Sequence, residues 1–442
     1  MKVVRRTALC FPIIVVLVVL ASANAGTTAP ANRPDAHAGT AAKTINLRIG
    51  DVAAFTGPLS AFGPSFYKAA QMAVAQARTA AKRAGVKLNI TLRSGDEGTG
   101  PQAAVSAARD LAARGMDCLL GGTSTGNSIA MAQAVTIPSR ITQIAPTASS
   151  SLWTPIHKAS GGRTFRAVPV DVFQVTVLAH FMARQLKGAK GKLVSVAGRN
   201  DSYGQPATSA FIRVWKKLGG RVSGPVLYDP NATSYDSDAA KIVAGNPVAI
   251  VIEDFPETYA KVGAALLRTG KFSAPKLFTT SGFPATIPSG TPPESLNGAW
   301  VVQPGQPTSG KVISTYNRLY ANFPADPKAQ QPFNVNNFDA TMLCILAAVS
   351  AKSADGPKIA KKVIPVSGPP GKAYSFLQLT AAFKALKQGK DIDYQGVSGA
   401  LDLDSNGNPT GSLSNVSRYR SGTLTLLQQF QFRKGKLTPV KG

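Results

Sequence analysis

The sequence predicts an α/β protein built from two doubly wound lobes. Strand-like and helix-like segments alternate along the chain, and such alternation is typical of parallel sheets covered by helices. The rhythm runs through twice, which indicates two similar lobes. In the first lobe, two successive apolar strands each end in a turn rich in serine and threonine. This pattern predicts a polar ligand pocket at the carboxyl edge of a sheet.

The first lobe begins with an apolar strand over Ile45–Val52. A helix over Pro64–Ala84 follows, because Ala, Met and Val recur there at helical spacing before Gly85. Pro101 suits the first turn of a helix over Gly100–Ala113. The remaining predicted elements of this lobe are strands Val86–Leu92, Met116–Leu120 and Thr142–Ile144, and helix Ser128–Val135.

The second lobe repeats the alternation after a crossover near Phe165–Asp171. Its predicted helices are Val172–Leu186, Gln205–Leu218, Ser237–Val243 and Pro256–Thr269, and its predicted strands are Lys192–Val196, Arg221–Leu227, Val248–Ile252 and Lys276–Thr279. The pattern changes from Trp300 onward. There we predict helices Ser309–Phe323, Asn336–Ser353 and Tyr374–Gln388, a Pro/Gly-rich surface loop Gly356–Gly371, and a β-rich tail Val397–Phe432 with a turn at Asp404–Asn408.

The first 25 residues have the features of a secretory signal peptide. Three cations precede the apolar run Phe11–Leu20, and Ala23-Asn24-Ala25 supplies small residues for cleavage. Residues 26–43 are rich in Ala, Thr, Pro and Gly, so we expect a flexible leader. No later segment has 18 consecutive apolar residues, so we expect an exported protein without a membrane span.

The charge of the chain restricts its expected partners. The formal net charge is +27, but the cations are scattered and no nucleic-acid motif is present. We therefore expect no nucleic-acid partner, and an association with an anionic cell envelope instead.

The mature chain keeps Cys118 and Cys344, which we predict to be buried thiols, with a single disulfide as the alternative.

The turns after two strands are the strongest candidate site. Gly121–Ser128 and Pro146–Ser150 leave hydroxyls and backbone N–H groups free, which suits an anion or a carboxylate. In the second lobe, Tyr203 follows one strand, and Glu253 and Asp254 end another. An aromatic ring there can stack on a ligand, and the carboxylates can hold a cationic group. The glycine-rich segment Ser94–Gly100 is interpreted as a polar loop that caps the next helix.

Enzymatic and metal sites are weakly supported. Gly122-Thr123-Ser124-Thr125-Gly126 has the spacing of a nucleophile elbow, but the required acid and histidine do not follow in order. The three histidines lack partners at metal-ligand spacing. A calcium-like segment starting at Asp402 has Leu413 where the closing acid would stand. We therefore expect a binding protein with no catalytic residue and no cofactor, and keep a hydrolase using Ser124 as an alternative.

Several segments together resemble the type I periplasmic binding proteins, in particular the leucine/isoleucine/valine-binding branch of ABC importers. The resemblance runs from about Thr44 to Phe432, and its matching segments are Phe55–Gly63, Gly121–Ser128, Pro146–Thr154, Thr164–Asp171, Asp201–Gly204, Asn337–Ala340 and Tyr394–Gly399. It implies two lobes, residues 44–167 with 299–395 and residues 168–298 with 396–442. Three crossovers would join them around a ligand cleft.

The resemblance also implies site residues. Ser124 or Thr125 and the pair Ala148-Ser149 would hold a ligand carboxylate, and Phe62 and Tyr203 would supply aromatic contacts. One departure is important: Ser281 stands where amino-acid binders place an acid for the α-ammonium group. Either Glu253 or Asp254 replaces that acid, or the ligand is not an α-amino acid, because an unpaired buried ammonium is costly.

The expected function is capture of a small polar or carboxylate-bearing molecule by closure of the two lobes. The resemblance implies a membrane permease and an ATPase as partners, and we expect a monomer. A ligand-sensing receptor domain of the same fold is the alternative.

Overall fold

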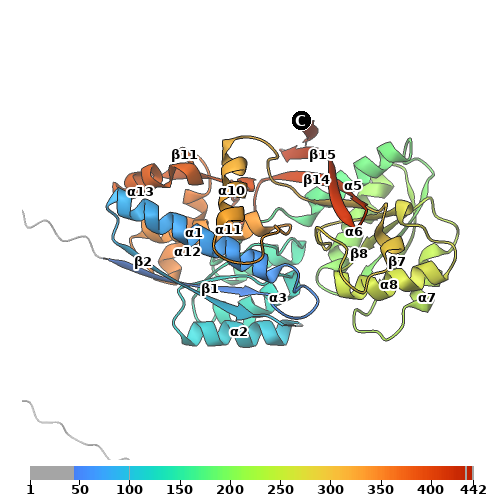
Figure 1. The fold of residues 1–442 in the computed structure, drawn as a ribbon, viewed down its shortest axis with the longest axis horizontal. Coiled ribbons are helices and arrows are strands. Elements are labelled where there is room, and N and C mark those ends of the chain that lie inside the picture. The colour runs from blue at the N-terminus through green and yellow to red at the C-terminus, as the bar shows by residue number, and fades with distance from the viewer. Residues whose placement is uncertain (1–43, 99, 434–435, 441–442) are drawn as a thin grey trace, which may run out of the picture. The chain divides into compact units, whose positions relative to one another are not determined.

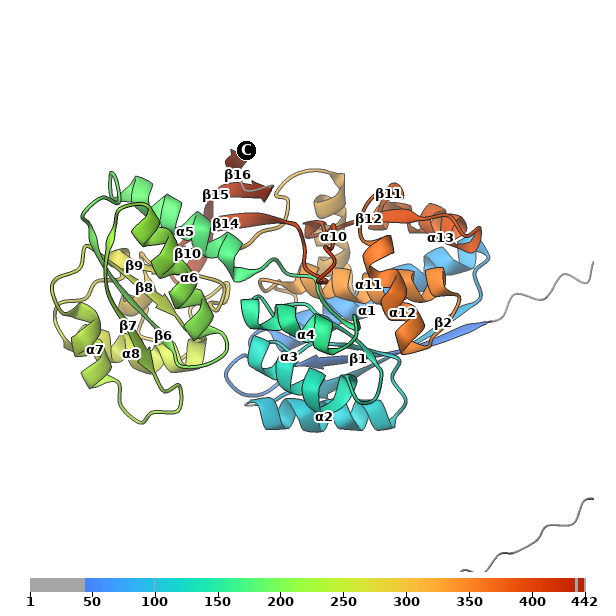
Figure 2. The same cartoon turned by 180° about the vertical axis from the view of Figure 1, so that it is seen from behind.

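The computed structural model describes residues 44–98, 100–433 and 436–440, with the side chain of Arg433 left out. The predicted signal peptide, residues 1–25, and the leader, residues 26–43, lie outside the described residues. Figures 1 and 2 show the described chain as two α/β lobes. Among the described helices, none has the length and apolar character needed to cross a membrane.

The first lobe contains a parallel sheet of five strands. Their order is β2-β1-β3-β4-β5, and they comprise β1 (Ile45–Ala53), β2 (Leu88–Asp96), β3 (Cys118–Leu120), β4 (Thr142–Ala145) and β5 (Thr164–Arg166). Helix α1 (Gly63–Ala84) lies above β1 in Figure 1 and α2 (Pro101–Ala113) below it. The predicted doubly wound topology is confirmed. The strand order reverses between β1 and β3, which is where open α/β sheets bind ligands.

Helix α1 forms as the alanine-rich sequence predicts. Ala69, Ala73 and Ala77 are fully buried, so their face packs on the sheet. Gly85 ends the helix with φ 65°, a left-handed conformation that favours glycine. After β3, α3 (Thr125–Met131) continues into a short π-helical segment, Ala132–Thr136.

The second lobe is built on an eight-stranded sheet in the order β16-β15-β14-β10-β9-β8-β6-β7. The strands β6 (Leu193–Arg199), β7 (Arg221–Tyr228), β8 (Ala249–Glu253), β9 (Leu277–Thr279) and β10 (Trp300–Pro304) pair in parallel. The last three strands, β14 (Gly411–Arg420), β15 (Thr423–Arg433) and β16 (Lys436–Val440), are antiparallel. Its helices are α5 (Asp171–Gln185), α6 (Gly204–Lys217), α7 (Asp236–Val243), α8 (Pro256–Arg268) and α9 (Pro293–Leu296).

The segment between β10 and β14 returns to the first lobe. It contains α10 (Lys311–Asn322), α11 (Asn334–Ala351), α12 (Gly356–Val366) and α13 (Leu379–Lys387), with a small sheet of β11 (Lys372–Ser375), β12 (Ile392–Gly396) and β13 (Gly399–Ala400). Residues Asn334–Val349 of α11 are buried without a gap, so this helix is a core element of the lobe. It shares one apolar cluster with α1 and β1.

Two secondary-structure predictions in this segment are wrong. Gly356–Gly371 is not a surface loop, because its first part forms α12. Asp355 caps that helix by accepting from the Lys358 backbone N–H at 3.1 Å, and proline in the first turn is compatible with a helix. The helix predicted over Tyr374–Gln388 begins only at Leu379, because Lys372–Ser375 pairs as β11 beside β12.

The predicted lobe boundaries also need correction. Strand β10 pairs with β9 in the second sheet, so residues 299–304 do not belong to the first lobe. Leu401 and Leu403, assigned to the second lobe, lie in the core of the first. The chain therefore crosses after Pro304 and again just before Gly411. Sequence patterning misplaced both points because a strand looks alike in either sheet.

Cys118 on β3 and Cys344 on α11 are both buried and unlinked. They lie in the same apolar cluster of the first lobe. The structure therefore has the two buried thiols that were predicted, and the disulfide alternative is not formed.

Candidate functional site

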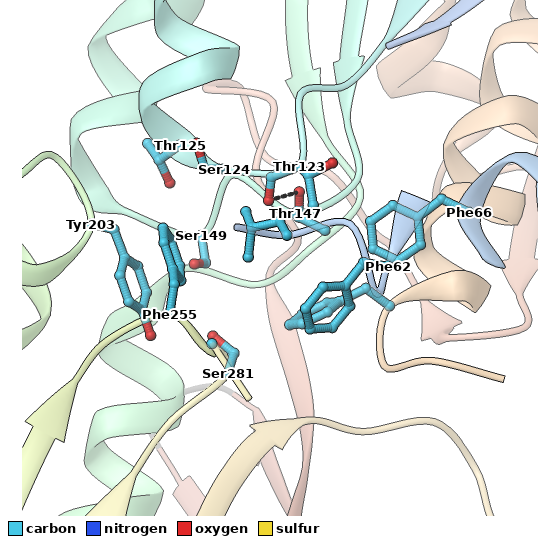
Figure 3. A pocket seen from close by; sticks show the side chains of 13 residues that line it. Phe62, Phe66, Thr123, Ser124, Thr125, Thr147, Ser149, Tyr203, Phe255 and Ser281 are labelled. Atoms are coloured by element: carbon cyan, nitrogen blue, oxygen red, sulfur yellow. Dashed lines mark hydrogen bonds between the residues drawn. The ribbon is translucent and has the colours of Figure 1, made fainter. Parts of the chain in front are cut away.

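A cavity opens between the loops that follow the strands of both lobes. It encloses about 390 Å³ including its opening, and its lining residues are Leu59, Phe62, Phe66, Thr123, Ser124, Thr125, Thr147, Ser149, Tyr203, Phe255, Ser281, Gly282 and Phe333. Figure 3 shows Thr123, Ser124, Thr125 and Thr147 together on one side, Phe62 and Phe66 on another, and Ser281 apart from these hydroxyl groups. Among the predicted site residues, Phe62, Ser124, Thr125, Ser149, Tyr203 and Ser281 line this cavity.

The turn after β3 is held rigidly by its neighbours. The Thr123 backbone N–H donates to Glu97 Oε2 at 2.9 Å, and Thr147 Oγ1 donates to the Thr123 carbonyl at 2.9 Å (Figure 3). Ser124 caps α3 by accepting from the Asn127 backbone N–H at 3.2 Å. Gly122 is required here because a Cβ would overlap Glu97 Oε2. The hydroxyl groups are therefore preorganised before any ligand arrives.

A buried cation supports the second turn. Arg166, at the end of β5, is fully buried and donates to the carbonyls of Ala148 and Ser150 at 2.7 and 2.9 Å. Burial lowers the pKa of Arg166 to about 10, so the guanidinium still carries its charge at neutral pH. Its positive charge lies directly behind the turn that presents Ser149, and it favours an anion there.

Ala148 is fully buried and does not line the cavity. Its carbonyl is occupied by Arg166, so its contribution is to shape the turn.

The second-lobe acids lie behind the cavity wall. Tyr203 donates its hydroxyl to Glu253 Oε2 at 3.0 Å, and Thr280 donates to the same oxygen. Glu253 is fully buried and does not line the cavity. Burial raises its pKa to about 8, so it is mostly neutral at pH 7. The Tyr203 ring, stacked on Phe255 at 4.8 Å between centroids, forms the surface that a ligand would meet.

Asp254 is engaged inside the second lobe. Tyr228 donates to its Oδ2 at 2.8 Å, the Phe255 backbone N–H donates to Oδ1 at 2.7 Å, and Arg199 pairs with it at 3.6 Å. Burial raises the pKa of Asp254 to about 7. It is absent from the cavity lining, so its role is to position Phe255 and Arg199.

Asp171, at the start of α5, was not predicted as a site residue, and like Glu253 it lies behind the cavity lining. Its backbone N–H donates to the Ser149 carbonyl at 2.8 Å. Its Oδ1 accepts from Gln174 Nε2 at 2.6 Å, and the same nitrogen donates to Ser281 Oγ at 3.2 Å. Its Oδ2 has no hydrogen-bond partner although the residue is only 2% exposed. Burial raises the pKa of Asp171 to about 6, so it is largely ionised at pH 7.

Phe333, Phe255 and Arg166 were also missed as site residues. Arg166 stood inside a segment that carried the family resemblance, and a cation ending a buried strand is a usable signal. Phe333 precedes α11, far along the chain, and no local pattern marks it as part of this cavity.

The described residues offer no support for catalysis or metal binding. No histidine lines the cavity, and His157 Nδ1 lies 2.6 Å from the Thr164 carbonyl. The Asp404–Asn408 turn closes on itself through an Asp404 N–H to Asn408 carbonyl bond of 2.8 Å. No cluster of three metal-ligating side chains occurs within the described part of the chain. The Ser124 hydroxyl accepts from the Asn127 backbone N–H at the start of α3.

Two α/β lobes that present a hydroxyl-lined and aromatic cavity at their switch points define a solute-binding protein of the two-lobed type. A family model described as periplasmic binding protein matches residues 46–418, and the chain belongs to this family. The resemblance that the sequence indicated is therefore confirmed. Membership identifies the chain as a binding protein of the periplasmic type.

Individual relatives are distant. The chain is 29% identical over 199 residues to Leu/Ile/Val-binding protein homolog 3 of Brucella melitensis, which covers 45% of this chain and 50% of the relative. It spans about half the length, or less, of the curated relatives it matches.

Solved structures of similar fold hold different ligands. The substrate-binding protein LivJ of Streptococcus pneumoniae, in complex with isoleucine, matches with a TM-score of 0.67 at 16% identity, over 90% of this chain and all of that one. A solute-binding protein of R. palustris, in complex with 4-hydroxybenzoate, matches with a TM-score of 0.67 at 16% identity, over 88% of this chain and 98% of that one. These likenesses show the fold alone.

Proposed function

We propose that this protein captures a small carboxylate-bearing molecule outside the cytoplasm and presents it to the permease and ATPase of an ABC importer. The observation that carries the proposal is the pair of fixed turns that aim the Ser124, Thr125 and Ser149 hydroxyls into one cavity. The Arg166 charge behind them supports an anion. Apolar and aromatic side chains opposite suit an apolar ligand body.

A binding titration tests this proposal. Mature protein is titrated calorimetrically with amino acids, aliphatic carboxylates, aromatic carboxylates and their uncharged amides. Carboxylates should bind, and the amide of the best carboxylate should bind at least tenfold more weakly, which corresponds to about 1.4 kcal/mol. Equal affinity for acid and amide would refute the carboxylate assignment.

We also propose a partner for an α-ammonium group. Asp254 is engaged by Arg199 and Tyr228, and Glu253 is mostly neutral at pH 7 because burial raises its pKa to about 8. Asp171, with a pKa of about 6, is largely ionised at that pH, and its backbone N–H donates to the Ser149 carbonyl. An ammonium group bound beside the carboxylate turns would therefore be held by Asp171. Asp171→Asn should weaken leucine binding at least tenfold and leave 4-methylpentanoate unaffected. Equal losses for both ligands would mean that Asp171 acts only on the fold.

We further propose that the exported protein, with its signal peptide cleaved near Ala25, is a monomer retained at an anionic envelope surface. Exposed lysines gather where α5 and α6 end and β6 and β7 begin, at Lys187, Lys190, Lys192, Lys216 and Lys217. A 2.9 Å bond from the Arg221 N–H to the Lys192 carbonyl joins the two loops. No Asp or Glu lies in residues 184–192 or 213–221.

Matched charge variants test this retention. Replacing these five lysines by glutamine should abolish sedimentation with vesicles containing anionic phosphatidylglycerol, since each cation near such a surface contributes about 1 kcal/mol. The control replaces five exposed lysines of the first lobe, Lys358, Lys361, Lys362, Lys384 and Lys390, with the same change in charge. Equal loss in both variants would show that only net charge matters.

A further inference from the structure

A second chamber adjoins the ligand cavity. It encloses about 780 Å³ including its opening, twice the space of the first, and shares Leu59, Ser124, Tyr203 and Phe255 with it. Its other walls come from both lobes and comprise Pro58, Glu97, Gly98, Gly100, Pro101, Gly126 and Asn127 of the first and Arg199, Asp201, Ser202, Pro230 and Asn231 of the second. The four shared residues border both the inner cavity and the outer chamber.

Glu97 gives the outer chamber an unsatisfied polar group. The side chain is fully buried, and its Oε1 has no hydrogen-bond partner, while Oε2 accepts from the Thr123 N–H. An unpaired buried polar atom costs about 1–3 kcal/mol, which a ligand group reaching Oε1 would offset. The same residue fixes the turn that carries Ser124, so both chambers depend on one side chain.

The charged side chain of Arg199 in the outer chamber is already engaged within the protein. Arg199 donates to Asp201 Oδ2 at 2.7 Å and to Thr258 Oγ1 at 2.6 Å, and it pairs with Asp254 at 3.6 Å. Its guanidinium also lies 4.5 Å from the centroid of the Phe255 ring. An anionic ligand group would have to compete with these two carboxylates. The remaining polar groups, on Asn127, Ser202 and Asn231, are neutral donors and acceptors.

We propose that the ligand is bipartite, with its carboxylate in the inner cavity and a neutral hydrogen-bonding tail, such as an amide, in the outer chamber. This proposal rests on the proposed capture of a carboxylate and adds the second recognition element. An amide both donates and accepts, which suits Glu97 in either protonation state and the carboxamides of Asn127 and Asn231. The tail would have to pass among the residues that border both chambers, which include Ser124 and Tyr203.

Four ligands that differ in two features test the proposal. Norleucine and Nε-acetyllysine share an unbranched chain and differ by an acetamide tail, and hexanoate and 6-acetamidohexanoate repeat the comparison without the α-ammonium group. Within at least one pair, the acetamide compound should bind at least tenfold tighter. Lysine and 2-aminoheptanedioate, with cationic and anionic tails, should bind no tighter than norleucine.

A chamber-filling variant identifies where the tail binds. Asn231 is exposed and donates its backbone N–H to Asp229 Oδ1 at 2.9 Å, and Asn406 makes the same turn contact with Asp404 Oδ1 at 2.9 Å. Asn231→Phe should remove the gain from the acetamide tail and leave the affinity for its tail-less partner within twofold. Asn406→Phe, which lies outside both chambers, should change neither, and both variants should melt within 2 °C of the parent protein.

Other results would overturn the inference. If the tail-less compounds bind as tightly as the acetamides, or if a charged tail is preferred, the outer chamber does not recognise a neutral group. If the acetamide gain survives Asn231→Phe, the tail binds elsewhere. If none of the four binds but another carboxylate in the calorimetric titration does, the inference about the tail fails and the proposed capture of a carboxylate stands. If no carboxylate binds in either experiment, both fail.

Discussion

Replacing Glu253 by glutamine should stabilise the ligand-free protein at alkaline pH and have little such effect in acid. The folded pKa of Glu253 is raised from 4.5 to about 8, chiefly by burial. Below pH 4.5 the carboxyl is protonated in both folded and unfolded chains, so burial of its charge costs nothing. As the pH rises toward 8, the unfolded chain ionises first and stability is lost. Glutamine stays neutral at every pH and escapes this loss.

The size of the effect follows from the two pKa values. With 4.5 unfolded and about 8 folded, ionisation lowers the free energy of unfolding by about 4 kcal/mol at pH 7.5 and about 1 kcal/mol at pH 5. The advantage of Glu253→Gln over the parent should therefore grow by about 3 kcal/mol between these pH values. Any constant cost of changing the bonds to Tyr203 and Thr280 cancels in this difference.

Urea unfolding followed by tryptophan fluorescence measures the difference directly. Parent and variant are compared at half-unit steps from pH 5 to pH 8, with urea midpoints and slopes fitted together. Glu257→Gln, on the exposed start of α8, is the control and should show the same advantage at every pH. If the difference in free energy of unfolding between Glu253→Gln and the parent is the same at every pH, as for Glu257→Gln, then Glu253 is ionised in the folded protein and the reasoning fails.

Three further substitutions have defined outcomes. Ser124→Ala removes the bond to the Asn127 N–H and should cost about 1 kcal/mol of stability and about 1–3 kcal/mol of ligand affinity, measured by melting and calorimetry. Gly126→Val places bulk where a Cβ lies 3.0 Å from Ser202 Oγ; it should weaken ligand binding tenfold or more while the urea midpoint stays within 0.3 M of the parent. Arg166→Met leaves four oxygen atoms without their donor and should lower the free energy of unfolding by about 4 kcal/mol or more. A loss below about 1 kcal/mol would contradict the role of Arg166 in supporting the turn.

The sequence was sufficient to predict elements with strong periodicity. Helix α1 and strand β1 appear within one residue of the predicted ends at Pro64 and Val52, because apolar spacing and a stop glycine act locally. Gly356–Gly371 was misinterpreted because proline and glycine counts were taken as loop signals. Gly356 and Pro357 follow Asp355 directly and therefore form the first turn of a helix. Proline is tolerated there, since it lacks only an N–H that would be unpaired anyway.

The candidate site was predictable to the extent that strand ends determine it. Ser124 and Ser149 follow neighbouring parallel strands, so topology alone brings them to one edge of the sheet. Phe333 reaches the cavity only because α11 packs against α1 and β1. Asp171 and Glu97 are recognised because each has a buried carboxyl oxygen without a hydrogen-bond partner. Such a deficit exists only in three dimensions.

Glu253 and Asp254, which were predicted as site residues, share one structural position with Glu97 and Asp171, which were not. Four buried carboxyl groups surround the two chambers, and each accepts a hydrogen bond that fixes part of the wall. Glu97 accepts from the Thr123 N–H, Asp171 from the Gln174 amide that reaches Ser281, Glu253 from Tyr203, and Asp254 from the Phe255 N–H. The sequence analysis predicted that Glu253 and Asp254 contact the ligand. In the structure they lie directly behind the residues that line the cavity.

This layer explains why the protein keeps groups that reduce its stability. Burial raises the pKa of all four acids to between about 6 and about 8, so each destabilises the fold as the pH rises past the value of a free carboxyl. A wall whose side chains are fixed by these hydrogen bonds stays in place when the ligand is absent, and less conformational entropy is then lost on binding. Glu253→Gln separates the two effects: a more stable protein with weaker ligand affinity would show that the stability cost serves to preorganise the Tyr203 wall, whereas unchanged affinity would assign that rigidity to the stacking of Tyr203 on Phe255.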